Sequence, residues 1–230
     1  LNLHKSEMQF PMPRTQRMYL PSVPSHIVQR GNDRKPGFFE NENYLFFLNC
    51  LESAANLLGG GSCLCFDGES YPSIDDTQCR ARHITRYALS WKSYVQYINK
   101  KYGRTNTLWE GRHKASLVDS ESIYSPVNDI LKEPNTRWHG RHPIDYRWSS
   151  YRHHIGEASS SLIEDHEVFQ RIVLLITERV FCYQALFRND LDVEDLKAVR
   201  KASSISMPLG DSDFKTKVET TLGRSIGYSK

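Results

Sequence analysis

The chain has 230 residues, 39% of them hydrophobic, which is enough for one α/β domain of ordinary size with a tail. Thirty Lys and Arg against 27 Asp and Glu leave a net charge of only +3, so global charge does not indicate nucleic-acid binding, which would need a local basic face. Five irregularly spaced cysteines exclude a disulfide framework, and no secretory or transmembrane run is visible, so we expect a cytoplasmic protein with no membrane partner.

The first half of the chain predicts an irregular lead-in, a strand and a helix. Residues 1–24 contain four prolines and little periodicity, and we treat residues 1–20 as an N-terminal extension. A strand is expected at about 25–31. From Asn41 to Leu58, apolar residues recur at three- and four-residue spacing, which predicts an amphipathic helix that ends at the glycines 59–61.

A second helix is predicted from Ile84 to Tyr102, with Gly103 as its stop, and a strand is expected to begin at 117–118. Residues 146–151 are typical of a compact closing element, and two further helices are expected over 193–202 and 212–222. Between the two long helices, the two strands that a ferredoxin-like order would place there have no recognisable signal in the sequence. The order predicts an α+β fold with a ferredoxin-like antiparallel sheet, helices on one face of it, and a helical C-terminal tail.

Two blocks carry the most specific pattern in the chain. One reads Ser-His-Ile-Val-Gln-Arg-Gly-Asn-Asp-Arg over residues 25–34, and the other runs from Tyr-Ile-Asn at 97–99 to Leu-Trp-Glu-Gly-Arg at 108–112. They resemble the REP-associated tyrosine transposases, relatives of the insertion-sequence-200-like enzymes that cut and rejoin single-stranded DNA. The resemblance covers roughly 12–58, 85–120, 143–156 and 181–224 in the family's order, about two thirds of the chain. It implies the same fold, with a transposase-like domain at 21–156 and a helical region at 157–230.

The chemistry that the resemblance implies has two parts. In this family a His-hydrophobic-His pair (the HUH motif) on a central strand holds Mg²⁺ or Mn²⁺, and a tyrosine hydroxyl attacks the scissile phosphate to form a phosphotyrosine linkage. The metal strand should lie within residues 62–78, yet no histidine occurs between His26 and His83. The tyrosine should precede an Asn-Pro-x-Arg-Ala-Gly motif, yet residues 128–138 contain none. We therefore expect no catalytic residue, no metal ligand and no cofactor in this chain as written.

These departures are compatible with changes of reading frame. Permitted codons for residues 62–78, read one nucleotide later, encode Asn-His-Ile-His-Leu-Leu within a hydrophobic strand. Codons for residues 122–131, read two nucleotides later, permit Gln-Arg-Tyr-Ile-Glu, and those for 133–140 permit Asn-Pro-Ile-Arg-Ala-Gly after a further shift. We interpret segments 62–82 and 122–141 as disrupted parts of the domain, an interpretation that fails if the gene's codons cannot yield these peptides.

Other chemically suggestive groups have ordinary structural explanations. Cys63, Cys65 and Cys79 lack the spacing of a zinc site, and the carboxylates between residues 67 and 76 are typical of a solvated loop. The histidines at 139, 142, 153 and 154 are expected at the surface. Tyrosines of the second helix are expected in the core or stacked on DNA, not as nucleophiles; they are Tyr94, Tyr97 and Tyr102.

A basic constellation fits the implied partner, single-stranded or hairpin DNA. Cationic side chains contact phosphates and an aromatic ring can stack on an unpaired base, whereas the alternative is a solvated charged surface. For Arg30, Asn32, Trp109 and Arg112, DNA contact and fold-specific packing both remain open. The expected DNA-binding residues are Arg30, Asn32, Arg34, Lys100, Arg104, Trp109, Arg112 and Lys114.

The sequence thus predicts a transposase-like DNA-binding protein of DNA transposition that has lost strand cleavage. One alternative is a non-catalytic protein that binds DNA hairpins. Another is the non-functional product of a decayed gene, which does not fold stably because Asp67, Gly68 and Pro72 suit a central strand poorly. The family's relatives often act as dimers, so a homodimer is a further expectation.

Overall fold

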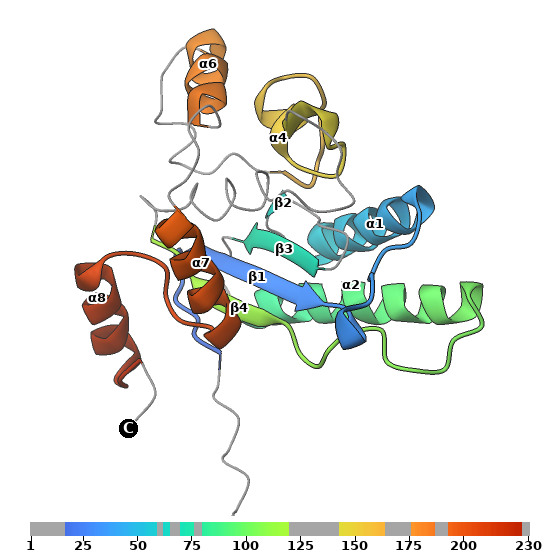
Figure 1. Ribbon diagram of the computed structural model, residues 1–230, viewed down its shortest axis with the longest axis horizontal. Coiled ribbons are helices and arrows are strands. Elements are labelled where there is room, and N and C mark those ends of the chain that lie inside the picture. The colour runs from blue at the N-terminus through green and yellow to red at the C-terminus, as the bar shows by residue number, and fades with distance from the viewer. Residues whose placement is uncertain are drawn as a thin grey trace, which may run out of the picture.

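The sheet has the predicted topology. The computed structural model describes residues 17–58, 62–64, 70–75, 80–119, 143–163, 176–186 and 193–226. Its elements begin in the order β1-α1-β2-β3-α2-β4 (Figure 1). The strands are β1 (Ser25–Arg30), β2 (Ser62–Leu64), β3 (Ser70–Asp75) and β4 (Lys114–Leu117), and the two helices are α1 (Asn41–Leu58) and α2 (Arg80–Lys101). The spatial order is β2-β3-β1-β4 with every pairing antiparallel, so the ferredoxin-like α+β prediction is confirmed.

Strand β1 runs through the middle of the sheet and fixes its two faces. Ile27 lies opposite Ala115 of β4, and His26 lies opposite Ser116. Cross-strand partners share a face and neighbouring residues alternate between faces. One face therefore carries Ile27 and Ala115, and the other carries His26 and Ser116.

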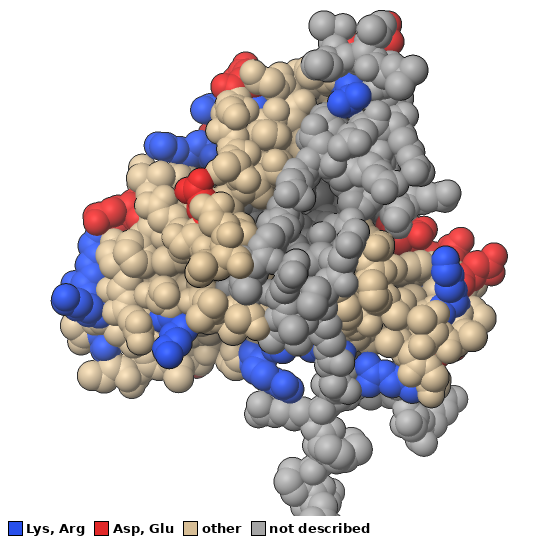
Figure 2. Space-filling view, turned by 180° about the vertical axis from the view of Figure 1, so that it is seen from behind, with Lys and Arg blue, Asp and Glu red and all other residues tan. Residues whose placement is uncertain are grey.

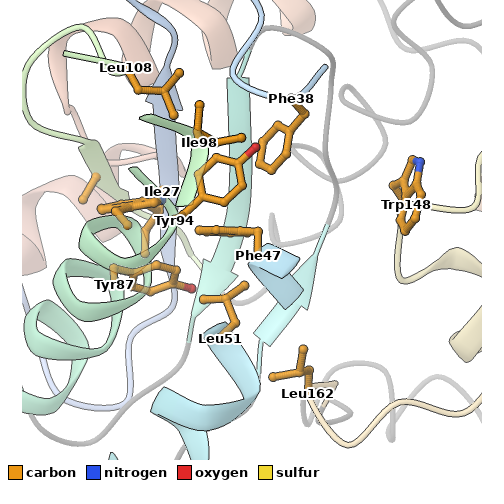
Figure 3. Packing of buried hydrophobic residues seen from close by; sticks show 12 residues of the cluster. Ile27, Phe38, Phe47, Leu51, Tyr87, Tyr94, Ile98, Leu108, Trp148 and Leu162 are labelled. Atoms are coloured by element: carbon orange, nitrogen blue, oxygen red, sulfur yellow. The ribbon is translucent and has the colours of Figure 1, made fainter. Parts of the chain in front are cut away.

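Helices α1 and α2 cover the face of Ile27 and build an aromatic core (Figure 3). Phe47 and Leu51 from α1 meet Tyr87, Tyr94 and Ile98 from α2 above the buried strand. The Tyr94 hydroxyl donates to the Gly37 carbonyl at 2.8 Å, so its one polar group is satisfied inside the core. Burial of each large apolar side chain contributes about 1.5–3 kcal/mol, which makes this layer the main source of stability.

The boundaries of the two helices follow local signals. Helix α1 has the predicted bounds, whereas α2 begins at Arg80 instead of Ile84. Helix α2 ends at Lys101, and Gly103 takes a φ of +61°, the left-handed conformation that glycine adopts without a Cβ penalty. The glycines predicted to end α1, residues 59–61, lie outside the described residues.

Strand β4 begins at Lys114, ahead of the predicted start at 117–118. Its first three residues, Lys-Ala-Ser, have weak strand propensity, but pairing with β1 draws them into the sheet. Strand β3 likewise forms although Pro72 stands in it, opposite Val28. Tertiary pairing overrides local preference at both places.

The opposite face of the sheet is covered by α7 (Val193–Ile205), which crosses β1 and β4 in Figure 1. His26 Nδ1 lies 3.0 Å from Ser203 Oγ, and Ser116 Oγ donates to the Ala202 carbonyl at 3.4 Å. Helices α1 and α2 thus lie on one face as predicted, and α7, from the predicted helical C-terminal region, covers the other. The physical reason is that buried polar side chains need partners, and the last turns of α7 supply them to His26 and Ser116.

The chain beyond α7 continues the edge of the sheet. Leu209 N donates to the Leu117 carbonyl at 2.7 Å, and Asp119 N donates to the Leu209 carbonyl at 2.8 Å. Helix α8 (Ser212–Leu222) follows with the predicted bounds. Its first turn is capped by Asp211, whose side chain accepts a hydrogen bond from Phe214 N at 2.7 Å.

The predicted closing element packs as a structural unit. Residues 146–151 follow η3 (Pro143–Asp145) and lead into α4 (Tyr151–His154). Helix α6 (Ile176–Leu186), which the sequence did not predict, packs beside α4. The Trp148 ring stacks on Tyr44 of α1 at 4.7 Å. His154 is buried with its ring 5.0 Å from that of Tyr183, so its predicted surface position is wrong. Within the described ranges, no helix has both the length and the apolar composition to cross a bilayer.

Candidate nucleic-acid interface

The two motif blocks meet where β1 ends. Helix η1 (Asn32–Arg34) follows β1, and residues 104–113 connect α2 to β4 (Figure 1). Asn32 N donates to the Leu108 carbonyl at 2.9 Å, and Glu110 N donates to the Arg30 carbonyl at 2.8 Å. An isolated antiparallel bridge between Gly31 and Trp109 lies between these bonds. The bonds hold residues 30–35 and 104–114 together as one unit, which we call the motif surface.

The motif surface is locally basic although the whole chain is not. Its two segments contain six Lys and Arg residues against two acidic ones, Asp33 and Glu110. Arg30 Nε lies 3.9 Å from Glu110 Oε2 with both side chains about half exposed, so this pair is weak. Among the described residues, no ion-pair partner stands beside Arg34, Arg104 or Arg112. These guanidinium groups are therefore available to phosphates.

The structure brings the predicted DNA-binding residues to one end of the sheet. Lys100 lies on the exposed last turn of α2, and Lys114 is the exposed first residue of β4. Asn32, Arg104 and Trp109 are half-buried, and the other predicted residues are exposed. In the view from behind, Lys and Arg side chains recur along the lower margin, where no Asp or Glu shows (Figure 2).

Trp109 shows the packing role that the sequence left open. Its ring lies 6.2 Å from Phe38 and 5.9 Å from Tyr94, measured between centroids. The Gly37 backbone passes so close that a Cβ there would come within 2.4 Å of the indole ring. Trp109 therefore anchors the motif surface to the aromatic core, and contact of its exposed part with DNA remains a prediction.

Arg17 belongs beside this surface, and sequence reasoning missed it. Its Nε donates to the His113 carbonyl at 3.1 Å, which ties the incoming chain to the end of the loop. Burial and, secondarily, the neighbouring Arg112 guanidinium lower the pKa of Arg17. Two guanidinium groups in mutual repulsion are an arrangement that a bound phosphate stabilises. No sequence signal pointed to Arg17, because it lies in the irregular lead-in outside both motif blocks.

The tyrosines of the α2 region have different surroundings. Tyr94 is fully buried, and burial raises its pKa far above the usual value, so it is a core residue as expected. The Tyr97 ring stacks on Phe46 at 3.9 Å. Tyr102, which directly follows α2, is 38% exposed and is the member of the three that remains accessible to a ligand.

The residues present do not fit the metal site that the resemblance implies. Strand β3 lies in the interior of the sheet, where the metal strand is expected, but its sequence Ser-Tyr-Pro-Ser-Ile-Asp contains no histidine. No group of three His, Cys, Asp or Glu residues gathers within the described parts of the chain. The predicted tyrosine segment, 122–141, and the loop carboxylates Asp67, Glu69 and Asp76 lie outside the described residues.

Comparison with solved structures shows a distant structural relationship to a REP-associated tyrosine transposase bound to a REP hairpin. The TM-score is 0.52 and the sequence identity 12%, over 67% of this chain and 99% of that chain. No protein-family model matches the sequence, and no curated protein matches it. At this identity the likeness establishes a shared fold, the same fold that the two motif blocks predicted.

Proposed function

We propose that the protein is a transposase-like DNA-binding protein of the cytoplasm that binds a DNA hairpin through the motif surface. The observation that carries this proposal is the set of guanidinium groups on two hydrogen-bonded loops that have no ion-pair partner within the described parts of the chain. Support comes from the fold, which is shared with a transposase bound to a hairpin. The motif blocks that resemble that family are the segments that form the surface.

We assign binding without cleavage to the chain as it stands. Cleavage and rejoining through a phosphotyrosine linkage, the activity implied by the resemblance, requires the His pair and the tyrosine that the sequence lacks. Removal of both groups leaves nothing to take over either role. Binding is therefore expected to be independent of Mg²⁺ and Mn²⁺. Homodimer formation stays a prediction, which light scattering coupled to size exclusion tests.

Salt dependence tests the binding proposal. Each phosphate neutralised by a cation releases a counterion, so each contact with duplex DNA makes the plot of log affinity against log salt steeper by about 0.9. We expect Arg112→Gln and Arg34→Gln each to weaken binding to a fluorescently labelled hairpin and to reduce the slope by about one. Lys215→Gln, on the exposed side of α8, is the matched control and should change neither quantity.

Two results of these binding measurements would contradict the proposal. Absence of hairpin binding by the intact chain at low salt refutes it. Equal weakening by Lys215→Gln and by the motif variants would show that net charge alone attracts DNA and that the motif surface is not the site.

A second candidate, cleavage by a frame-corrected chain, is favoured by the position of β3. The histidines permitted by a one-nucleotide shift fall at positions 70 and 72, which pair with Arg30 and Val28 of β1. Alternate positions of a strand share one face, as joint metal binding by two imidazoles requires. Resequencing the codons of 62–78 and 122–140 tests whether a corrected frame exists. A corrected chain that fails to nick a hairpin with either Mg²⁺ or Mn²⁺ would exclude this candidate.

A further inference from the structure

Two exposed aromatic rings lie beside the motif surface. Phe39 is 42% exposed and Tyr102 is 38% exposed, although neighbouring aromatic side chains such as Phe38 are buried. The two ring centroids lie 5.0 Å apart with the planes at 59°. The guanidinium carbon of Arg104 lies 5.6 Å from the Phe39 centroid. Two exposed rings and one half-buried cation, from the segment before α1 and the segment after α2, thus form a single cluster at the surface.

We propose that Phe39, Tyr102 and Arg104 form a stacking platform for unpaired bases of a DNA strand adjoining the hairpin. The proposal rests on the proposed function and names the part of the surface that reads single-stranded DNA. Proteins that bind single strands combine aromatic faces, on which bases stack, with cations that follow the phosphates. A guanidinium group can itself stack on a base or hold an aromatic ring by cation–π attraction.

The platform is ordered before any ligand arrives. Phe39 N donates to Asn43 Oδ1 at 2.9 Å, and the Tyr102 hydroxyl donates to the same oxygen at 3.2 Å and to the Glu40 carboxylate. Arg104 N donates to the Asn99 carbonyl at 2.9 Å, which fixes the turn that carries it. Because the Tyr102 ring and the Phe39 backbone are held by these bonds and the two rings contact each other, stacking a base on them costs little additional side-chain entropy.

The nearby carboxylates do not make the platform acidic. Lys101 Nζ lies 2.9 Å from Glu40 and 2.6 Å from Glu42, so one ammonium group is shared between two carboxylates. Hydrogen bonds from Tyr102 and Lys101 hold the pKa of Glu40 below its usual value, which keeps it ionised inside this network. Arg104 and Lys100 remain as cations with no ion-pair partner among the described residues, and they favour a polyanion.

The test compares a blunt DNA hairpin with the same hairpin carrying a short single-stranded extension that contains 2-aminopurine. We expect Phe39→Leu and Tyr102→Leu each to weaken binding of the extended hairpin at least about fivefold, with loss of fluorescence quenching, and to leave the blunt hairpin unaffected. Tyr102→Phe keeps the ring and should retain quenching. Phe181→Leu, at an exposed aromatic residue on α6, is the matched control and should change nothing.

The other outcomes separate this inference from the function on which it rests. No binding of either hairpin by the wild-type chain overturns the proposed function and the platform with it. Wild-type binding without quenching, or equal loss of both hairpins in the leucine variants, overturns the platform alone. If a leucine variant does not fold, judged by its circular dichroism, quenching by the wild type and by Tyr102→Phe decides the question.

Discussion

His26 makes the folded chain sensitive to acid. Its side chain is 4% exposed, Nδ1 lies 3.0 Å from Ser203 Oγ, and Nε2 is buried with no hydrogen-bond partner among the described residues. Burial lowers its pKa to about 4, from an ordinary value of 6.5. A proton on this imidazole would place an uncompensated charge between the sheet and α7. Acidification should therefore weaken the contact that closes the second face of the sheet.

The sign and size of the effect follow from the two pKa values. The unfolded chain binds the proton more tightly than the folded chain. The contribution of neutral His26 to the free energy of unfolding is therefore fully present above pH 6.5 and is lost as the pH falls toward 4. The shift from 6.5 to about 4 corresponds to roughly 3.4 kcal/mol in total, at about 1.36 kcal/mol for each pKa unit. Between neutral pH and about pH 5, roughly 2 kcal/mol of this should already be lost.

Urea unfolding followed by circular dichroism measures this loss across the same pH range. His26→Gln cannot titrate and should remove about 2 kcal/mol of the pH dependence while the other histidines and carboxylates titrate as before. Proton NMR of the imidazole gives the native pKa directly. Equal pH dependence in wild type and His26→Gln, or a measured pKa near 6.5, would refute the reasoning.

Three further predictions concern single positions in the fold. Gly37→Ala drives a Cβ into the Trp109 ring and should cost about 1–3 kcal/mol in urea unfolding; an unchanged midpoint would contradict the close approach seen here. Pro72→Thr returns a backbone donor to β3 where it pairs with Val28 of β1 and should add about 0.5–1.5 kcal/mol, whereas a lower melting temperature would count against the strand. Asp211→Ala removes the cap of α8 and should lower the local stability of its first turn by about 0.5–2 kcal/mol. Faster amide hydrogen exchange in that turn measures the loss, and the amides of α1 are the unaffected control.

Local signals in the sequence were enough for the elements whose ends are set by neighbouring residues. Helix α1 and helix α8 have the predicted bounds, because periodicity marks their buried sides and local residues end them. For α8 these are Asp211, which caps the first turn, and Gly223, which takes the left-handed conformation after the last. Strands β2 and β3 carried no such signal, since their Ser-, Pro- and Asp-containing sequences have low strand propensity and only pairing with β1 places them.

The candidate site divides in the same way. Residues of the two motif blocks were recognisable because their order and spacing are specific, whereas the hydrogen bonds between the blocks are seen only in the structure. Arg17, Phe39 and the sharing of Lys101 between two carboxylates were not predictable, because each depends on segments far apart in sequence. Whether an aromatic ring is exposed also depends on how the whole chain packs and not on the residues next to it in sequence.

By itself, the sequence determined the outer strand-helix-helix-strand frame of the ferredoxin-like fold, the helices whose ends are set locally and the basic character of the motif blocks. Only the tertiary structure decided that α7 closes the second face of the sheet over His26, and that Trp109 packs into the core while Phe39 and Tyr102 stay exposed. The physical reason is range. Helix periodicity and capping act within a few residues, whereas burial and the pairing of polar groups depend on which distant segments meet.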